Sequence, residues 1–141
     1  MPDSVAVASL PENPPLILAE TEVRRLSVLA SLKQGYDHVS AGLLKREINR
    51  AQICKDAYVP PQFVRMHSIV RFSHAGVHSP DVPLVYPSEA DPASGMISVL
   101  SWEGAALIGL SMGATIWWPC DQGEARPVSV MRVTPPDRLH F

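Results

Sequence analysis

The feature that most constrains this chain is a change in the spacing of apolar residues at Pro60-Pro61. Before these prolines, over residues 16–55, apolar residues recur at steps of three and four, which is typical of amphipathic helices. After them, short runs of β-branched and aromatic residues are separated by turns, which is typical of strands. Proline lacks a backbone N–H and disfavours helix in the residue before it. The sequence therefore predicts a helical part followed by a β-rich part, which is an α+β fold.

The helical part is predicted to be a hairpin of two helices, at residues 20–33 and 40–54, within a unit that spans residues 16–55. Each helix carries one apolar stripe, and a polar stretch with a glycine separates the helices. The two stripes are therefore expected to face each other in a short antiparallel coiled coil. Residues 1–15 contain four prolines and few large apolar side chains, which predicts a flexible leader.

The β-rich part is predicted to be one domain over residues 60–134, followed by a tail at 135–141. Five strands are expected, at residues 66–72, 82–86, 96–100, 114–118 and 127–133. A short apolar helix interrupts them at Glu103–Leu110, with Ser101 as its N-cap and Gly113 just past its end. Because a helix this apolar must be covered, we expect a curved antiparallel sheet packed on it.

Composition excludes several classes of protein. The 141 residues are 46% apolar, and 12 basic residues nearly balance 14 acidic ones, which fits a globular chain and not a general nucleic-acid binder. No apolar run approaches the roughly 20 residues that cross a bilayer. The two cysteines, Cys54 and Cys120, form no CxxC motif, so we expect free thiols in a reducing cytoplasm.

Histidine and tryptophan are the remaining residues with chemical potential. His67, His74 and His78 lack a cysteine partner and an evident carboxylate cluster, so the sequence predicts solvated surface histidines and no metal site. Trp117 and Trp118 are adjacent on a predicted strand, where side chains alternate between faces. One indole is expected in the core and the other at the surface.

Several blocks of sequence, in one order over residues 17–134, resemble a known family. They are Arg50–Cys54, Met66–Phe72, Leu84–Pro87, Gly95–Val99 and Gly104–Gly109, followed by Gly113. The later blocks resemble the C-terminal domain of the Gre transcript-cleavage factors, and the whole set resembles the regulator of nucleoside diphosphate kinase family. The resemblance implies an FKBP-like domain, a short N-terminal coiled coil and binding to bacterial RNA polymerase near its secondary channel.

The expected tip of the hairpin comprises Tyr36, Asp37 and His38. Gre factors hold a catalytic metal with carboxylates at the tip of a long coiled coil, because Mg²⁺ requires several hard oxygen ligands. This tip offers one acid, Asp37, which stands where a helix N-cap is expected. We therefore expect no catalytic residue, no metal, no cofactor and no stimulation of transcript cleavage.

The expected partner-binding residues are Ser101, Trp102, Glu103 and Gly104. The resemblance implies that this loop touches a coiled coil at the rim of the polymerase channel. Trp102 stands where the family usually has proline. An exposed tryptophan is a frequent interface anchor. The alternative is that Ser101 only caps the helix and Trp102 only packs.

The function that these observations predict is a polymerase-binding regulator that competes with Gre-type factors, and not an enzyme. Two alternatives remain open. One is an FKBP-like prolyl isomerase or chaperone-like module, although the chain's three Phe and three Tyr are few for an aromatic proline pocket. The other is an interaction module that keeps the fold without binding polymerase.

Overall fold

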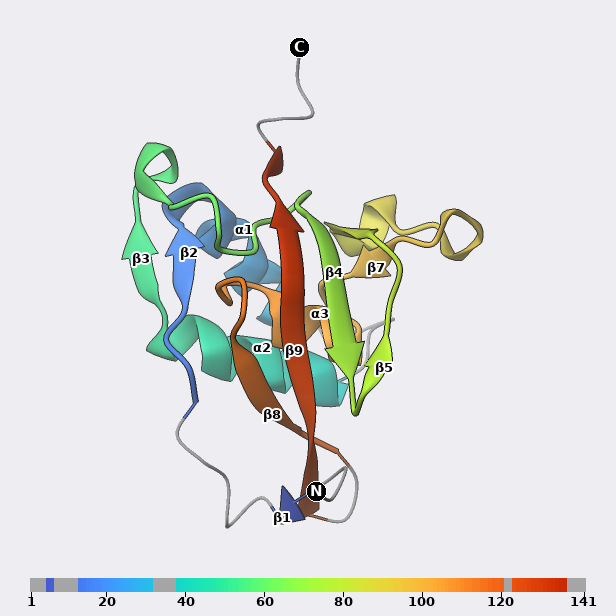
Figure 1. Cartoon of the computed structure of the whole chain (residues 1–141). Coiled ribbons are helices and arrows are strands. Elements are labelled where there is room, and N and C mark those ends of the chain that lie inside the picture. The colour runs from blue at the N-terminus through green and yellow to red at the C-terminus, as the bar shows by residue number, and fades with distance from the viewer. Residues whose placement is uncertain (1–4, 7–12, 32–37, 121–122, 137–141) are drawn as a thin grey trace.

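The computed structural model describes residues 5–6, 13–31, 38–120 and 123–136. Within them, a mixed sheet stands in front of the helices (Figure 1). Its strands are β1 (Val5–Ala6), β4 (Ile69–His74), β5 (Val77–His78), β6 (Val82–Val85), β7 (Ile97–Ser98), β8 (Thr115–Pro119) and β9 (Glu124–Thr134). The order is β1-β9-β4-β6-β7, with β5 paired to β4 and β8 paired to β9. Three short 3-10 helices connect elements, at Asp56–Tyr58, Pro87–Glu89 and Pro92–Ser94.

Strands β4 and β9 form the centre of the sheet. They pair antiparallel from Ile69 opposite Thr134 to His74 opposite Val128, and the register shifts between Arg71 and Phe72. A bulge of this kind bends a strand and increases its twist, so it contributes to the curl of the sheet. The expected terminal hairpin is confirmed, since β8 pairs antiparallel with β9. The pair β6–β7 is parallel, however, so the sheet is not wholly antiparallel as expected.

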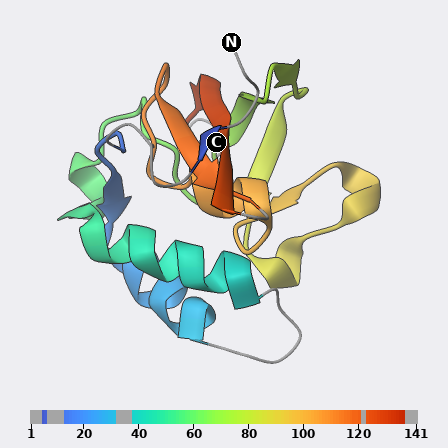
Figure 2. The ribbon, with the colours of Figure 1, turned by 90° about the horizontal axis from the view of Figure 1, so that it is seen from below.

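The short helix α3 (Trp102–Leu107) begins at the predicted N-cap, because the Ser101 hydroxyl accepts the Gly104 N–H at 3.1 Å. It ends earlier than predicted. The backbone leaves the helix at Ile108, and Gly109 adopts a φ of 82°, a conformation that favours glycine. Helix α3 lies between the sheet and the hairpin (Figure 2), where its apolar side chains are covered.

The predicted helical hairpin is confirmed as α1 (Glu20–Ser31) and α2 (His38–Arg50), which pack against each other. The second helix ends earlier than the predicted residue 54, and the segments next to the hairpin are strands. Ile17–Ala19 forms strand β2 and Gln52–Cys54 forms strand β3, and the two pair in parallel. Isoleucine at positions 17 and 53 favours strand, and the backbone of each segment finds its hydrogen-bond partners in the other.

One hydrophobic cluster joins the hairpin to the β-rich part. It contains, among others, Leu26, Leu44, Ile48, Leu107, Trp118 and Val128. Trp118 is fully buried and Trp117 half-buried, so one indole lies in the core as expected. The boundaries of the hairpin unit, the domain, the leader and the tail stay predictions, but the core is shared. Two leader residues, Val5 and Ala6, pair with Ala125 and Glu124.

No helix among the described residues combines the length and the apolar character needed to cross a membrane. Both cysteines are free thiols and both are half-buried.

Candidate partner-binding site

A hollow of about 440 Å³ lies where α2, α3 and one end of the sheet meet. We call it the Trp102 hollow. It is lined by Val39 and Leu43 of α2, by Trp102 and Glu103 of α3, by His74, Pro119 and Arg126 from the sheet, and by Cys120 just after β8. The loop predicted from the resemblance therefore lies beside the first two turns of α2. Of the predicted tip, His38 begins α2, whereas Tyr36 and Asp37 lie outside the described residues.

The loop that enters α3 is held firmly against strand β7. The Ser101 hydroxyl donates to the Ser98 carbonyl at 2.6 Å while it accepts the Gly104 N–H. A Cβ added at Gly104 would lie 1.9 Å from the same Ser98 oxygen. Only glycine fits at this close approach, because any side chain would push the loop off the sheet. The loop therefore presents Trp102 in a fixed position.

Trp102 forms one wall of the hollow. Its indole N–H donates to the Pro119 carbonyl at 2.6 Å, and its ring lies 4.6 Å from the His74 ring at an interplanar angle of 38°. The side chain is half-buried and packs against the core. Trp102 thus has the packing role that one alternative predicted, and it still exposes part of its ring to the hollow. An indole held on one side and exposed on the other is well suited to a contact surface.

Two charged side chains of the hollow are unpaired within the part of the chain that the structure describes. Glu103 is half-buried in the first turn of α3, and Arg126 is exposed on β9. Neither side chain forms an ion pair or a hydrogen bond with a described residue. A carboxylate and a guanidinium that face the same hollow provide one hydrogen-bond acceptor group and one donor group for a partner.

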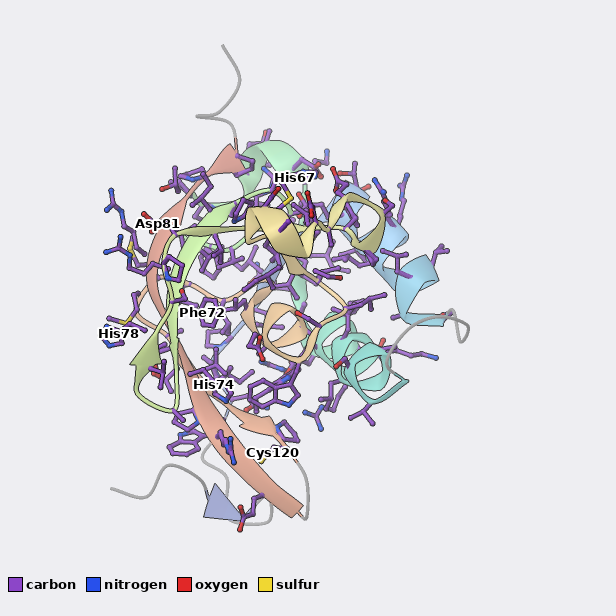
Figure 3. All side chains as sticks on the ribbon, turned by 90° about the vertical axis from the view of Figure 1, so that its right-hand side faces the viewer. His67, Phe72, His74, His78, Asp81 and Cys120 are labelled. Carbon is purple, nitrogen blue, oxygen red and sulfur yellow. The ribbon has the colours of Figure 1, made fainter. Side chains whose placement is uncertain are left out.

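A second hollow of about 420 Å³ adjoins the first, since His74, Glu103 and Arg126 line both. We call it the outer hollow. Its other walls come from β4, β5 and the turn between them, and they include Phe72 and the 73% exposed Val77. Figure 3 shows Phe72 and His74 along β4, with Cys120 beyond His74. The two hollows together form a groove that runs from β5 to α2, with His74 at its middle.

The three histidines differ more than the sequence indicated. His67 Nε2 lies 2.9 Å from a carboxylate oxygen of Glu89, and His78 is exposed. His74 is half-buried against Trp102, and its Nε2 is buried without a hydrogen-bond partner among the described atoms. The prediction of three solvated histidines is therefore wrong for His74. No group of three His, Cys, Asp or Glu residues among those described is arranged to hold a metal ion.

A second cluster of polar residues, which we call the Glu22 network, attaches α1 to the β-rich part. The Glu22 carboxylate accepts the Met66 N–H at 2.9 Å and two N–H groups of Arg65 at 3.0 and 2.8 Å. Beside it, Asp56 accepts both the hydroxyl and the N–H of Thr21. The Thr21 hydroxyl is the main cause of a lowered pKa at Asp56, with the nearby Arg65 also contributing.

Ring contacts extend this attachment. The Arg25 guanidinium lies 3.6 Å from the centre of the Tyr86 ring, a cation–π geometry. Burial, with the Glu22 charge second, raises the pKa of Tyr86 to about 12. Burial also acts to raise the pKa of Glu89, but hydrogen bonds from His67 and the Tyr86 N–H outweigh it and lower that pKa. The charged groups Glu22, Arg25 and Glu89 therefore each have a partner within the chain.

Sequence reasoning identified the loop at Trp102 but missed His74, Arg126 and Val39 as its neighbours. These residues come from β4, β9 and α2, and nothing local in the sequence marks them. The structure shows why Val39 belongs to the hollow, since it is an apolar residue in the first turn of α2 that is 67% exposed.

Comparison with known proteins identifies the family to which this chain belongs. Residues 59–135 match the family described as "Transcription elongation factor, GreA/GreB, C-term". The chain belongs to this GreA/GreB family. Over 122 residues it is also 30% identical to the "Regulator of nucleoside diphosphate kinase" of Escherichia coli (strain K12), with 86% of this chain and 90% of that protein covered. The protein of the same name from Shigella flexneri matches to the same extent.

A solved structure agrees with this assignment. The "Prokaryotic transcription elongation factor GreA/GreB from Nitrosomonas europaea" is 30% identical, with a TM-score of 0.66 over 86% of this chain and 99% of that chain. The expected family and the α+β arrangement of a helical hairpin followed by a curled sheet on a short helix are confirmed. The finer expectation of an FKBP-like domain stays a prediction.

Proposed function

We propose that this protein is a cytoplasmic transcription regulator that binds RNA polymerase near its secondary channel and competes there with Gre-type factors. It does so without stimulating transcript cleavage. Membership of the GreA/GreB family supports the choice of partner. Identity of 30% to regulators of nucleoside diphosphate kinase supports a regulatory role in place of an enzymatic one.

The short, packed hairpin is the observation that carries the proposal. Its helices have 12 and 13 residues, so at ~1.5 Å per residue each is only about 18 to 20 Å long. The first turns of α2 line the Trp102 hollow, and α2 packs on α3. Over its described residues, the hairpin therefore adds little reach beyond the domain. Chemistry at a distant active centre requires groups within hydrogen-bond distance of the reacting atoms, which such a hairpin cannot supply.

Binding is tested with purified RNA polymerase from the native host. The tagged chain is expected to retain polymerase on a column, and excess Gre factor is expected to elute it. A chain that fails to retain polymerase, or that Gre factor does not displace, contradicts the proposal.

Cleavage is tested on a backtracked transcription complex. We expect no acceleration above the polymerase's own rate when the chain is added, and slower Gre-stimulated cleavage when both proteins are present. A Gre factor alone is the positive control. Metal-dependent cleavage that Asp37→Ala abolishes would show that the hairpin reaches the active centre after all.

Prolyl isomerisation is the competing activity, and the groove offers little for it. Among the described residues, the only ring in contact with Trp102 is that of His74. An assay of cis/trans interconversion in a proline peptide is expected to show no acceleration by the chain.

A further inference from the structure

The groove formed by the Trp102 hollow and the outer hollow combines apolar and charged side chains. Each end carries apolar side chains, Val39 and Leu43 at one end and Phe72 and Val77 at the other, where His78 and Ser79 also lie. Val39 and Val77 are 67% and 73% exposed, so water is in contact with apolar surface at both ends. Exposed apolar groups around a concave surface mark a binding groove when they occur together.

The charges in the middle of the groove restrict what it can bind. Glu103 and Arg126 line both hollows, and neither side chain pairs with another described residue. An anionic ligand would be attracted by Arg126 but repelled by Glu103. A cationic ligand would be attracted by Glu103 but repelled by Arg126. A neutral group that offers both an N–H and a carbonyl satisfies the two together, and the peptide bond is such a group.

We propose that this groove binds an extended, uncharged peptide segment with two apolar side chains. In an extended chain, residues two apart point to the same side at a spacing of roughly 7 Å. Two such side chains enter the Trp102 hollow and the outer hollow. The peptide bonds between them lie over Glu103, which accepts an N–H, and Arg126, which donates to a carbonyl. The inference does not depend on RNA polymerase as the source of the segment.

The probe is the blocked pentapeptide acetyl-Ser-Leu-Ser-Leu-Ser-amide, titrated into the full chain while the indole N–H signal of Trp102 is followed by NMR. This signal is assigned to Trp102 by its loss in the Trp102→Phe variant. We expect the signal to shift with a dissociation constant of about 1 mM, which is reasonable for a short flexible ligand. Peptides with aspartate or lysine in place of both leucines are expected to cause no shift at about 5 mM.

Two variants test the contacts in the middle of the groove. Glu103→Ala and Arg126→Ala are each expected to weaken binding of the leucine peptide about tenfold, the effect of losing one charge-assisted hydrogen bond. Tyr58→Ala is the matched control, because Tyr58 is 74% exposed and lines neither hollow. It is expected to leave binding unchanged.

Three outcomes would overturn the inference. They are the absence of any shift with the leucine peptide at about 5 mM, stronger binding of the aspartate or lysine peptide, and unchanged binding in both groove variants. The second outcome would assign the groove to a charged partner. Polymerase binding is measured separately on the column, so failure of the peptide to bind is distinguishable from failure of the proposed function.

Discussion

The Glu22 network and the Trp102 groove both contain charged groups at the edge of the core, but they use them in opposite ways. The Glu22 carboxylate forms three hydrogen bonds within the chain, and only 11% of its side chain is exposed. In the groove, Glu103 and Arg126 have no side-chain partner among the described residues, and a His74 nitrogen is buried without one. Saturated polar groups stabilise a fold, whereas unsaturated ones remain available to a partner. The Glu22 network therefore fixes the hairpin to the β-rich part, whereas the groove keeps its polar groups available to a partner.

The largest effect is expected at Glu22. Glu22→Ala leaves the Arg65 guanidinium and the Met66 N–H without their main partner, in a place where both side chains of the pair are at most 15% exposed. We expect a loss of about 3 kcal/mol in the free energy of unfolding and a melting temperature roughly 10 °C lower. Thermal and denaturant unfolding measure this.

Glu20→Ala is the control for that loss. Glu20 lies on the same helix and pairs with Arg24, but the two side chains are 46% and 77% exposed. Its loss is expected to cost less than about 0.5 kcal/mol. Equal losses in the two variants would show that the Glu22 network is not the part that fixes the hairpin.

The next effect is expected in binding. Trp102→Ala should weaken polymerase binding about thirtyfold, or ~2 kcal/mol, because it removes the exposed face of an anchored indole. Affinity and thermal unfolding are measured on the same sample, since Trp102 also donates to Pro119. Trp117→Ala is the control, a half-buried indole that lines neither hollow. Unchanged affinity in folded Trp102→Ala would remove this residue from the interface.

A smaller effect is expected in the pH dependence of stability. The pKa of Asp56 is lowered in the folded state, chiefly by the Thr21 hydroxyl. Asp56 therefore contributes to the free energy of unfolding above its unfolded pKa of about 3.9. This contribution is lost as the pH falls through its pKa in the folded state. Asp56→Asn should flatten the fall in stability between about pH 5 and pH 2. The change should stay below about 1 kcal/mol, because solvent screens this partly exposed carboxyl. Identical pH profiles of stability for Asp56→Asn and the unchanged protein would contradict this prediction.

The smallest effects are expected at the unpaired charges of the groove. Because Glu103 and Arg126 make no side-chain contact of the kind that stabilises a fold, Glu103→Ala and Arg126→Ala should each change the free energy of unfolding by less than about 0.5 kcal/mol. Denaturant unfolding measures this. A loss above about 1 kcal/mol in either variant would mean that the charge stabilises the fold, and the contrast with Glu22 would fail.

Local signals in the sequence predicted the local structure well. The spacing of apolar residues located both helices of the hairpin, Ser101 was identified as the cap of α3, and the final β-hairpin lies where turn residues indicated it. Each of these depends on residues a few positions apart, where backbone geometry and capping determine the result.

Long-range contacts were not predictable in this way. The parallel pairs β2–β3 and β6–β7 join segments whose own sequences do not specify a partner. Glu22 and Arg65 are 43 positions apart, and no local pattern connects them. The groove likewise combines residues from α2, α3, β4, β8 and β9. Such contacts depend on how the elements pack, so only the loop at Trp102 was recognisable, through the family resemblance.

The pairing of β2 with β3 has a consequence for how such proteins diversify. The chain enters the hairpin after Ala19 and leaves it before Gln52. These residues lie on neighbouring parallel strands and are offset by two positions, so the entry and exit points are only about 8 Å apart. Whole heptads added equally to both helices would move the connection between them outward and leave these entry and exit points in place. The fold thus permits gradual change in the length of the hairpin, and length can evolve separately from the body that carries it.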